Sequence, residues 1–137
     1  MEQFMKLRAF IDIEKIGWQF LSENPSAIHL LEANQDKIRW VNLSANPATE
    51  AIKLLEANQE KIQWINLSEN TASGAIKLLE ANQEKINWMC LSGNPAPGAI
   101  KLLEANRYKI NWTRLSQNPR AIQLLEANQK KIYWVNL

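Results

Sequence analysis

Apolar residues recur along the chain in a short code that appears twice in each repeating unit. The first copy reads I-x-L-L-x-A, as at 52–57, and the second reads I-x-W-I-x-L, as at 62–67. On an α-helix, offsets 0, +2, +3 and +5 cover one broad face and leave offsets +1 and +4 turned outward. The pattern therefore predicts two short α-helices per unit, each about two turns long. Isolated helices of this length are marginal in water, so stacking between units must hold them.

The whole chain follows one period, which its tryptophans mark most clearly. They are separated by 22, 24, 24, 24 and 22 residues, and the phrase LLEAN recurs in step with them. The tryptophans are Trp18, Trp40, Trp64, Trp88, Trp112 and Trp134. A constant period in the twenties is typical of solenoids, in which each unit buries its apolar face against its neighbours. We therefore predict an all-α solenoid of two-short-helix repeats, with the tryptophans in its core.

Asparagines at 12-residue steps divide each period into two halves. Each Asn is interpreted as a helix N-cap, because its side-chain oxygen accepts an unsatisfied backbone N–H, and the proline that often follows suits the first helical turn. Apolar pairs three residues apart in the second half leave room for a partly 3₁₀ second helix. The predicted organisation is a single repeat domain over 1–137, with a cap and first tryptophan half-unit at 1–23 and repeats at 24–45, 46–69, 70–93, 94–117 and 118–137.

The pattern L-S-x-N-P-x-A-I-x-L-L-E-x-N-x-x-K-I-x-W resembles short repeats in uncharacterised proteins of large DNA viruses that infect protists, over Ile13 to Leu137. The 24-residue unit is also similar to leucine-rich repeat variant proteins, which alternate an α-helix with a 3₁₀-helix in a right-handed superhelix. The second match is partial, because that family lacks the tryptophan and shifts the apolar spacing by one. These resemblances imply a fold and a role as a viral binding protein, and they transfer no active site.

Composition and charge narrow the classes of function. The 137 residues are 46% hydrophobic and 22% charged, with a net charge of +2, so no strong field favours nucleic acid or an anionic membrane. The first residues lack the apolar core of a signal peptide, and no apolar run is long enough for a membrane span. The single cysteine, Cys90, excludes an internal disulfide or a cysteine metal cluster. We expect an intracellular, cytoplasmic protein.

No catalytic or cofactor chemistry is apparent in the motifs. His29 is the only histidine and lies in an outward slot, Cys90 occupies a slot held elsewhere by Asn and is expected to be partly exposed, and no Gly-rich phosphate loop or metal-ligand spacing occurs. We predict no enzyme activity, no cofactor and no metal.

The recurrent lysines have two interpretations. One lysine precedes each isoleucine of the second half, at Lys15, Lys37, Lys61, Lys85, Lys109 and Lys131. They form either a phosphate-binding rail or a solvated face with Glu–Lys contacts between neighbouring helices. The matching glutamates of the LLEAN phrase and the small net charge favour the solvated face.

The positions that vary while the scaffold stays constant are the candidate binding residues. They are the outward slots of the tryptophan half, with Val41, Ile65, Met89 and Thr113 beside them. The slots hold Arg39, Asn42, Gln63, Asn66, Asn87, Cys90, Asn111, Arg114, Tyr133 and Asn136. Solenoids commonly bind a protein or peptide along such a strip, although drift on a solvated face would give the same pattern.

The predicted function is a non-enzymatic scaffold for protein–protein interaction. The alternatives are nucleic-acid binding along the lysines and a purely structural, self-assembling module. Phe4, Leu7, Phe10 and Ile11 are expected to cap the first layer, whereas the chain stops at KKIYWVNL without a polar capping helix. Because solenoids need capped ends, some self-association through the C-terminal end is expected.

Overall fold

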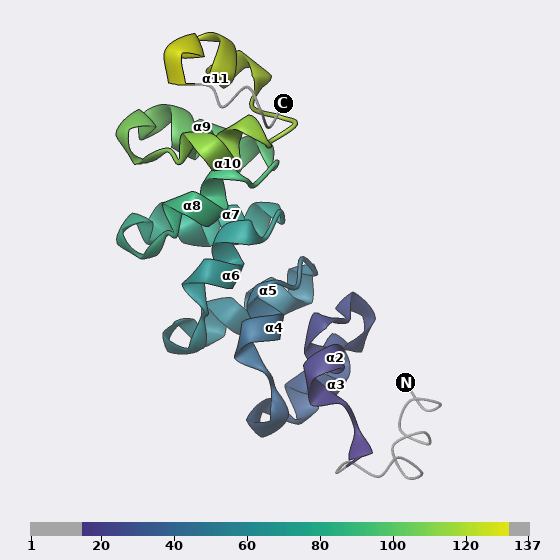
Figure 1. Ribbon diagram of the computed structural model, residues 1–137. Coiled ribbons are helices and arrows are strands. Elements are labelled where there is room, and N and C mark those ends of the chain that lie inside the picture. Colours follow the sequence, from purple (N-terminus) through teal and green to yellow (C-terminus); the bar gives the residue numbers. More distant parts are fainter. Residues whose placement is uncertain (1–14, 132–137) are drawn as a thin grey trace.

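The computed structural model describes residues 15–131; residues 1–14 and 132–137 lie outside this description. Every regular element in this range is helical, which confirms the all-α fold class, and no strand occurs between 15 and 131. Figure 1 shows the helices following one another in chain order, from α2 at one end of the molecule to α11 at the other. The predicted N-terminal cap residues and Trp134 fall outside the described residues.

Each layer contains two α-helices and a 3₁₀ turn between them. The leucine helices, which carry the LLEAN phrase, are α3 (Ile28–Ala33), α5 (Thr49–Ala57), α7 (Ser73–Ala81), α9 (Pro97–Ala105) and α11 (Ile122–Glu126). The tryptophan helices are α2 (Trp18–Glu23), α4 (Trp40–Ser44), α6 (Trp64–Glu69), α8 (Trp88–Ser92) and α10 (Trp112–Ser116). The 3₁₀ turns are η3 (Gln35–Lys37), η4 (Gln59–Lys61), η5 (Gln83–Lys85), η6 (Arg107–Lys109) and η7 (Gln129–Lys131), and a further 3₁₀ turn, η2 (Pro25–Ala27), precedes α3.

The second half of each unit does not begin as predicted. Ile62, expected as the first helical residue, is extended with φ −62° and ψ 131°, and Gln63 is extended as well. The helix starts at Trp64 and is α-helical, while the 3₁₀ geometry lies before it in η4. This two-residue delay changes which residues of the tryptophan helix face the core.

The recurrent asparagines do not serve as predicted either. The N-caps of α5, α7 and α9 are Ala48, Ala72 and Ala96, none with a side-chain cap bond. Asn24 caps as expected, accepting from the Ser26 N–H at the start of η2, where Pro25 occupies the first turn. Asn46, Asn70 and Asn94 accept the N–H of the same three alanines, one residue before the helix begins. The LLEAN asparagines end helices instead; Asn58 Nδ2, for example, donates to the Leu54 carbonyl at 2.8 Å.

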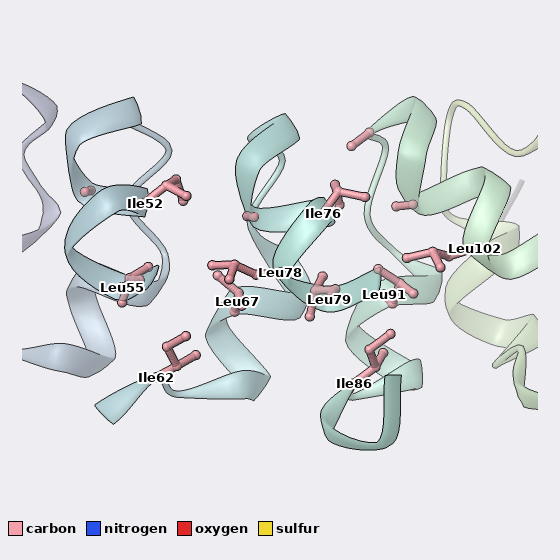
Figure 2. Packing of buried hydrophobic residues seen from close by; sticks show 14 of the residues in the cluster. Ile52, Leu55, Ile62, Leu67, Ile76, Leu78, Leu79, Ile86, Leu91 and Leu102 are labelled. Atoms are coloured by element: carbon pink, nitrogen blue, oxygen red, sulfur yellow. The ribbon is translucent and has the colours of Figure 1, made fainter. Parts of the chain in front are cut away.

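Leucines at the centre of each layer form the core. One leucine from each α-helix of α3 to α10 is completely buried, in the order Leu31, Leu43, Leu55, Leu67, Leu79, Leu91, Leu103 and Leu115. Figure 2 shows several of these side chains in the space between the helices, with Ile62 and Ile86 beside them. The helices contain only five to nine residues, so this shared burial supplies stability that none of them has alone.

The tryptophans contribute less to the core than predicted. Trp18 is buried, but Trp40, Trp64, Trp88 and Trp112 are only half-buried and pack against the edge of the leucine core. Part of each of these four half-buried residues therefore lies at the surface of the molecule.

Successive layers pack like against like. Tryptophan helices contact the next tryptophan helix from α2 to α10, and leucine helices contact the next leucine helix from α3 to α9. Two glycines permit a close approach of leucine helices: a Cβ at Gly98 would lie 2.7 Å from Ile76 Cγ2, and one at Gly74 would lie 2.9 Å from Ile52 Cγ2.

A buried ladder of serine and asparagine side chains joins each layer to the next. Ser44 Oγ donates to the Trp40 carbonyl in its own helix and accepts from the Gln63 N–H of the following layer. Asn70 Nδ2 donates back to the Ser44 and Asn46 carbonyls. The same bonds recur at Ser68 with Asn94 and at Ser92 with Asn118. The L-S-x-N phrase therefore encodes contacts between layers.

Candidate interaction surface

The recurrent lysines lie on the half-buried tryptophans of the preceding layer. Lys61 Nζ is 5.0 Å from the Trp40 ring centroid, and Lys85 Nζ is 5.0 Å from that of Trp64. Lys109 over Trp88 and Lys131 over Trp112 repeat this geometry at 4.8 and 5.1 Å. A cation at this distance is attracted to the face of the indole ring. The lysines thus reinforce layer stacking.

At Lys61, Lys85 and Lys109, the contacts found among the described residues are with tryptophan rings and not with the glutamates that the sequence predicted. The ion pairs found within residues 15–131 join His29 to Glu32 at 3.8 Å and Arg114 to Glu69 at 4.0 Å. His29 is exposed, so its contact with Glu32 is a surface interaction of small energy.

The predicted binding strip divides into exposed, half-buried and buried positions. Arg39 and Gln63 are exposed, and Cys90 is buried rather than partly exposed as predicted. The half-buried members are Asn42, Asn66, Asn87, Asn111 and Arg114, while Tyr133 and Asn136 lie outside the described residues. The strip is therefore not one uniform surface.

Two asparagines of the strip have local structural roles. Asn87 accepts the Cys90 N–H at 2.9 Å and so caps α8, and Asn111 accepts the Arg114 N–H at 2.9 Å and so caps α10. Arg39 and Gln63 occupy the same position before α4 and α6 and make no such bond. Their side chains are the members of this column available to a partner.

A polar bridge at the next column spans three successive tryptophan helices. Arg114 of α10 reaches Glu69 at the end of α6, with Cys90 of α8 between them. Burial and a hydrogen bond to the Glu69 carboxylate raise the pKa of the Cys90 thiol. Arg114 Nε is buried without a hydrogen-bond partner, while the Arg114 and Glu69 side chains as a whole are 43% and 55% exposed. Near the other end of the stack, Asn42 donates to Glu23.

An exposed apolar row lies on three consecutive tryptophan helices. Val41 of α4 is 50% exposed, Ile65 of α6 is 60% exposed and Met89 of α8 is 53% exposed. The prediction that offset +3 of the second code is buried is therefore wrong. The same residues were nevertheless predicted to lie beside the variable slots of the binding strip, and that prediction identifies this row. Thr113 continues it on α10 as an exposed polar residue.

The grooves found over residues 15–131 are open to solvent. One groove between α5 and α7 has a volume of about 430 Å³ and is lined by Pro47, Ile52, Lys53, Glu56 and Lys77, among others. Within residues 15–131, no group of three or more His, Cys, Asp or Glu side chains is arranged to hold a metal ion. In the same range, no helix has the length and apolar character to cross a membrane.

Comparison with known proteins gives no match to a protein-family model, to a curated protein or to a solved structure. The resemblance to viral repeats and to leucine-rich repeat variant proteins therefore stays a prediction. Function has to be argued from the surface itself.

Proposed function

We propose that the chain is an α-solenoid that acts as a non-enzymatic scaffold for a protein or peptide partner. The observation that carries this proposal is the exposed row of Val41, Ile65 and Met89. Single exposed apolar residues are common, but a row of them at one position of consecutive helices is typical of interaction sites. Arg39 and Gln63, exposed on neighbouring positions, supply polar contacts at its edge.

The layer geometry sets the spacing that a partner must match. Packed helices lie about 8–10 Å apart, so the row presents one apolar side chain at each such step. A peptide in the polyproline II conformation with an apolar residue at every third position repeats at about 9 Å along one face, and a helix with one at every seventh repeats at about 10.5 Å. Either partner would contact all three residues of the row.

The residues that recur in every layer support a scaffold rather than an enzyme. The leucines fill the core, the Ser–Asn ladder joins layers, and the lysines lie on tryptophan rings. These roles account for the conserved pattern within the chain without a chemical step. The residues that differ between layers are those left for recognition.

A peptide-display selection tests this proposal. We expect wild-type protein to enrich peptides with apolar residues at a regular spacing, and the Ile65→Ser, Met89→Ser double variant to lose them. Both side chains are exposed, so the folded state should tolerate the changes to within about 0.5 kcal/mol. Tyr108→Ser removes an exposed side chain on η6 and serves as the control. Equal enrichment by the double variant, or none by wild type, would contradict the proposal.

Self-association is a second candidate, favoured by Ile122 on α11. Its side chain is 51% exposed, whereas the equivalent Ile76 on α7 is 4% exposed because Gly98 of α9 packs against it. A further layer placed on Ile122 would bury it in the same way. Sedimentation at increasing concentration should show association that Ile122→Ser weakens. A wild-type protein that stays monomeric at every concentration rules this candidate out.

A further inference from the structure

The 3₁₀ turns change charge along the molecule. The turns η3, η4 and η5 read QDK, QEK and QEK, so Asp36, Glu60 and Glu84 each balance the lysine that follows. The turns η6 and η7 read RYK and QKK, so Arg107 with Lys109 and Lys130 with Lys131 give each a formal charge of +2. The glutamate that ends each LLE phrase is common to all these layers and leaves the contrast unchanged. We call Arg107, Tyr108, Lys109, Lys130 and Lys131 the basic turn pair.

The two turns occupy equivalent places in consecutive layers. Lys109 lies over Trp88 of the preceding layer, and Lys131 lies over Trp112 in the same way. Because α8 and α10 pack together, the two ammonium groups repeat one layer apart on the same edge of the stack. The ion pairs found among residues 15–131 involve neither Arg107 nor Lys130, so both of these cations face solvent without a carboxylate partner there.

An exposed aromatic ring lies beside one of these cations. Tyr108 is 82% exposed, and Lys109 Nζ is 5.5 Å from its ring centroid. Burial does not explain the position of this ring, because the equivalent residue in η4 and η5 is a glutamate. An exposed ring on a basic surface is the combination that proteins use to hold single-stranded nucleic acid, with a base stacked on the ring and phosphates near the basic side chains.

We propose that the basic turn pair binds single-stranded nucleic acid without sequence preference. This site is independent of the apolar row and of the proposed scaffold function. An acidic peptide would meet the same cations but has no flat face to stack on Tyr108. The carboxylates of η3, η4 and η5 confine the site to the last two turns, so a lysine rail along the whole molecule is not what we infer.

The size of the site limits its affinity and its dependence on salt. At most four cations contact phosphates, and each contact on a single strand contributes about 0.7 to the slope of log K against log salt. The slope should therefore be no steeper than about −3. Loss of the stacked ring should weaken binding by about 5-fold to about 160-fold.

Three variants copy sequences that the scaffold already accepts. Lys130→Glu converts η7 from QKK to the QEK of η4 and η5, and Glu84→Lys converts η5 from QEK to the QKK of η7. Tyr108→Glu combined with Arg107→Gln converts η6 to QEK. Lys77→Glu on α7 makes the same change in charge as Lys130→Glu at an exposed site on a leucine helix, and it is the matched control.

Fluorescence anisotropy of a labelled oligo(dT) or oligo(rU), titrated at several salt concentrations, tests the proposal. We expect Lys130→Glu to weaken binding and flatten the salt slope by about 0.7 or more. The double substitution in η6 should abolish binding, Glu84→Lys should strengthen it, and Lys77→Glu should change little. Tyr108→Ala isolates the stacking contribution at unchanged charge. Thermal melts confirm that each variant folds.

Three results would overturn the inference. The first is no binding by wild type at low salt. The second is an affinity that Tyr108→Ala leaves unchanged, since the ring would then contribute no stacking. The third is a glutamate-rich peptide of equal charge that competes as well as the oligonucleotide, since the turns would then bind acidic chains in general.

Discussion

Asn70 connects two layers through a side chain that is only 2% exposed, so its removal probes the joint between layers directly. Its Nδ2 donates to the Ser44 and Asn46 carbonyls at 3.0 Å each, and its Oδ1 accepts the Ala72 N–H at 3.0 Å. The substitution Asn70→Ala removes all three bonds and leaves two carbonyls and one amide without this partner in the interior.

The expected cost follows from these three groups. A buried polar group that loses its partner costs about 1–3 kcal/mol, and partial relaxation of the cavity reduces the sum, so we expect a loss of about 3–5 kcal/mol. Stabilities of single domains are about 5–15 kcal/mol, so this loss would be visible in any unfolding experiment. Asn58→Ala is the matched control. Asn58 is half-buried and its side chain donates one hydrogen bond, to the Leu54 carbonyl, so its removal should cost about 1 kcal/mol.

Urea unfolding followed by circular dichroism measures both values, provided that the m-values of the variants agree. Asn70→Asp adds a second test, because it keeps the acceptor for Ala72 but places a carboxylate oxygen against the Ser44 and Asn46 carbonyls. We expect it to cost at least as much as Asn70→Ala at neutral pH. If Asn70→Ala were no more destabilising than Asn58→Ala, the reasoning that buried amide bonds join the layers would be refuted.

Three further predictions follow from other contacts. A double-mutant cycle between Lys85→Gln and Trp64→Leu should give a coupling free energy of about 0.5–1 kcal/mol, because the ammonium group lies over a partly buried tryptophan. Trp64→Ala should lower the free energy of unfolding by about 2–3 kcal/mol, which is below the value for a fully buried tryptophan. The raised pKa of Cys90 keeps the folded thiol neutral at pH values where the thiol of the unfolded chain ionises. The contribution of Cys90 to stability is therefore complete below the unfolded-state pKa and declines as pH rises through the folded-state pKa. The Cys90→Asn variant, which copies Asn42 and Asn66, should remove this alkaline decline in urea unfolding. Gly98→Ala should destabilise by about 1–3 kcal/mol through its clash with Ile76, whereas Gly93→Ala, whose nearest neighbour is the movable end of Arg114, should be close to neutral in thermal melts.

Each of these has an outcome that would contradict it. Zero coupling in the cycle would remove the lysine–tryptophan contact from the energetics of stacking. An alkaline decline that persists unchanged in Cys90→Asn would assign it to another group. Equal effects at Gly98 and Gly93 would show that the leucine helices do not approach as closely as the Ile76 contact requires.

The period and the helical class could be predicted from the sequence because both follow from the spacing of large apolar residues. The leucines of the first code are buried as expected, and the layers pack in chain order. The helix starts were wrong for a physical reason. Asn70 accepts the Ala72 N–H as a cap would, but its Nδ2 also bonds to the preceding layer, and the helix begins only after Ala72.

The surface could be predicted only in part for a related reason. The apolar spacing predicts a second helix that starts at Ile62 and turns Ile65 inward, whereas the actual start at Trp64 turns Ile65 out to solvent. The lysine contacts were missed because Lys85 lies over a tryptophan of the preceding layer and not over a residue of its own helix. Contacts between layers depend on how the units stack, which the period alone does not specify.

Amide hydrogen exchange at Gln63, Asn87 and Asn111 tests the central claim, that side-chain bonds between successive layers hold the stack together. These three residues lie outside the helices in extended backbone, and each N–H donates to a serine Oγ of the preceding layer at 3.0 Å. We predict opening free energies close to those of the core amides of Leu67 and Leu91. Exchange of all three at the rate of unprotected loop amides would contradict the account.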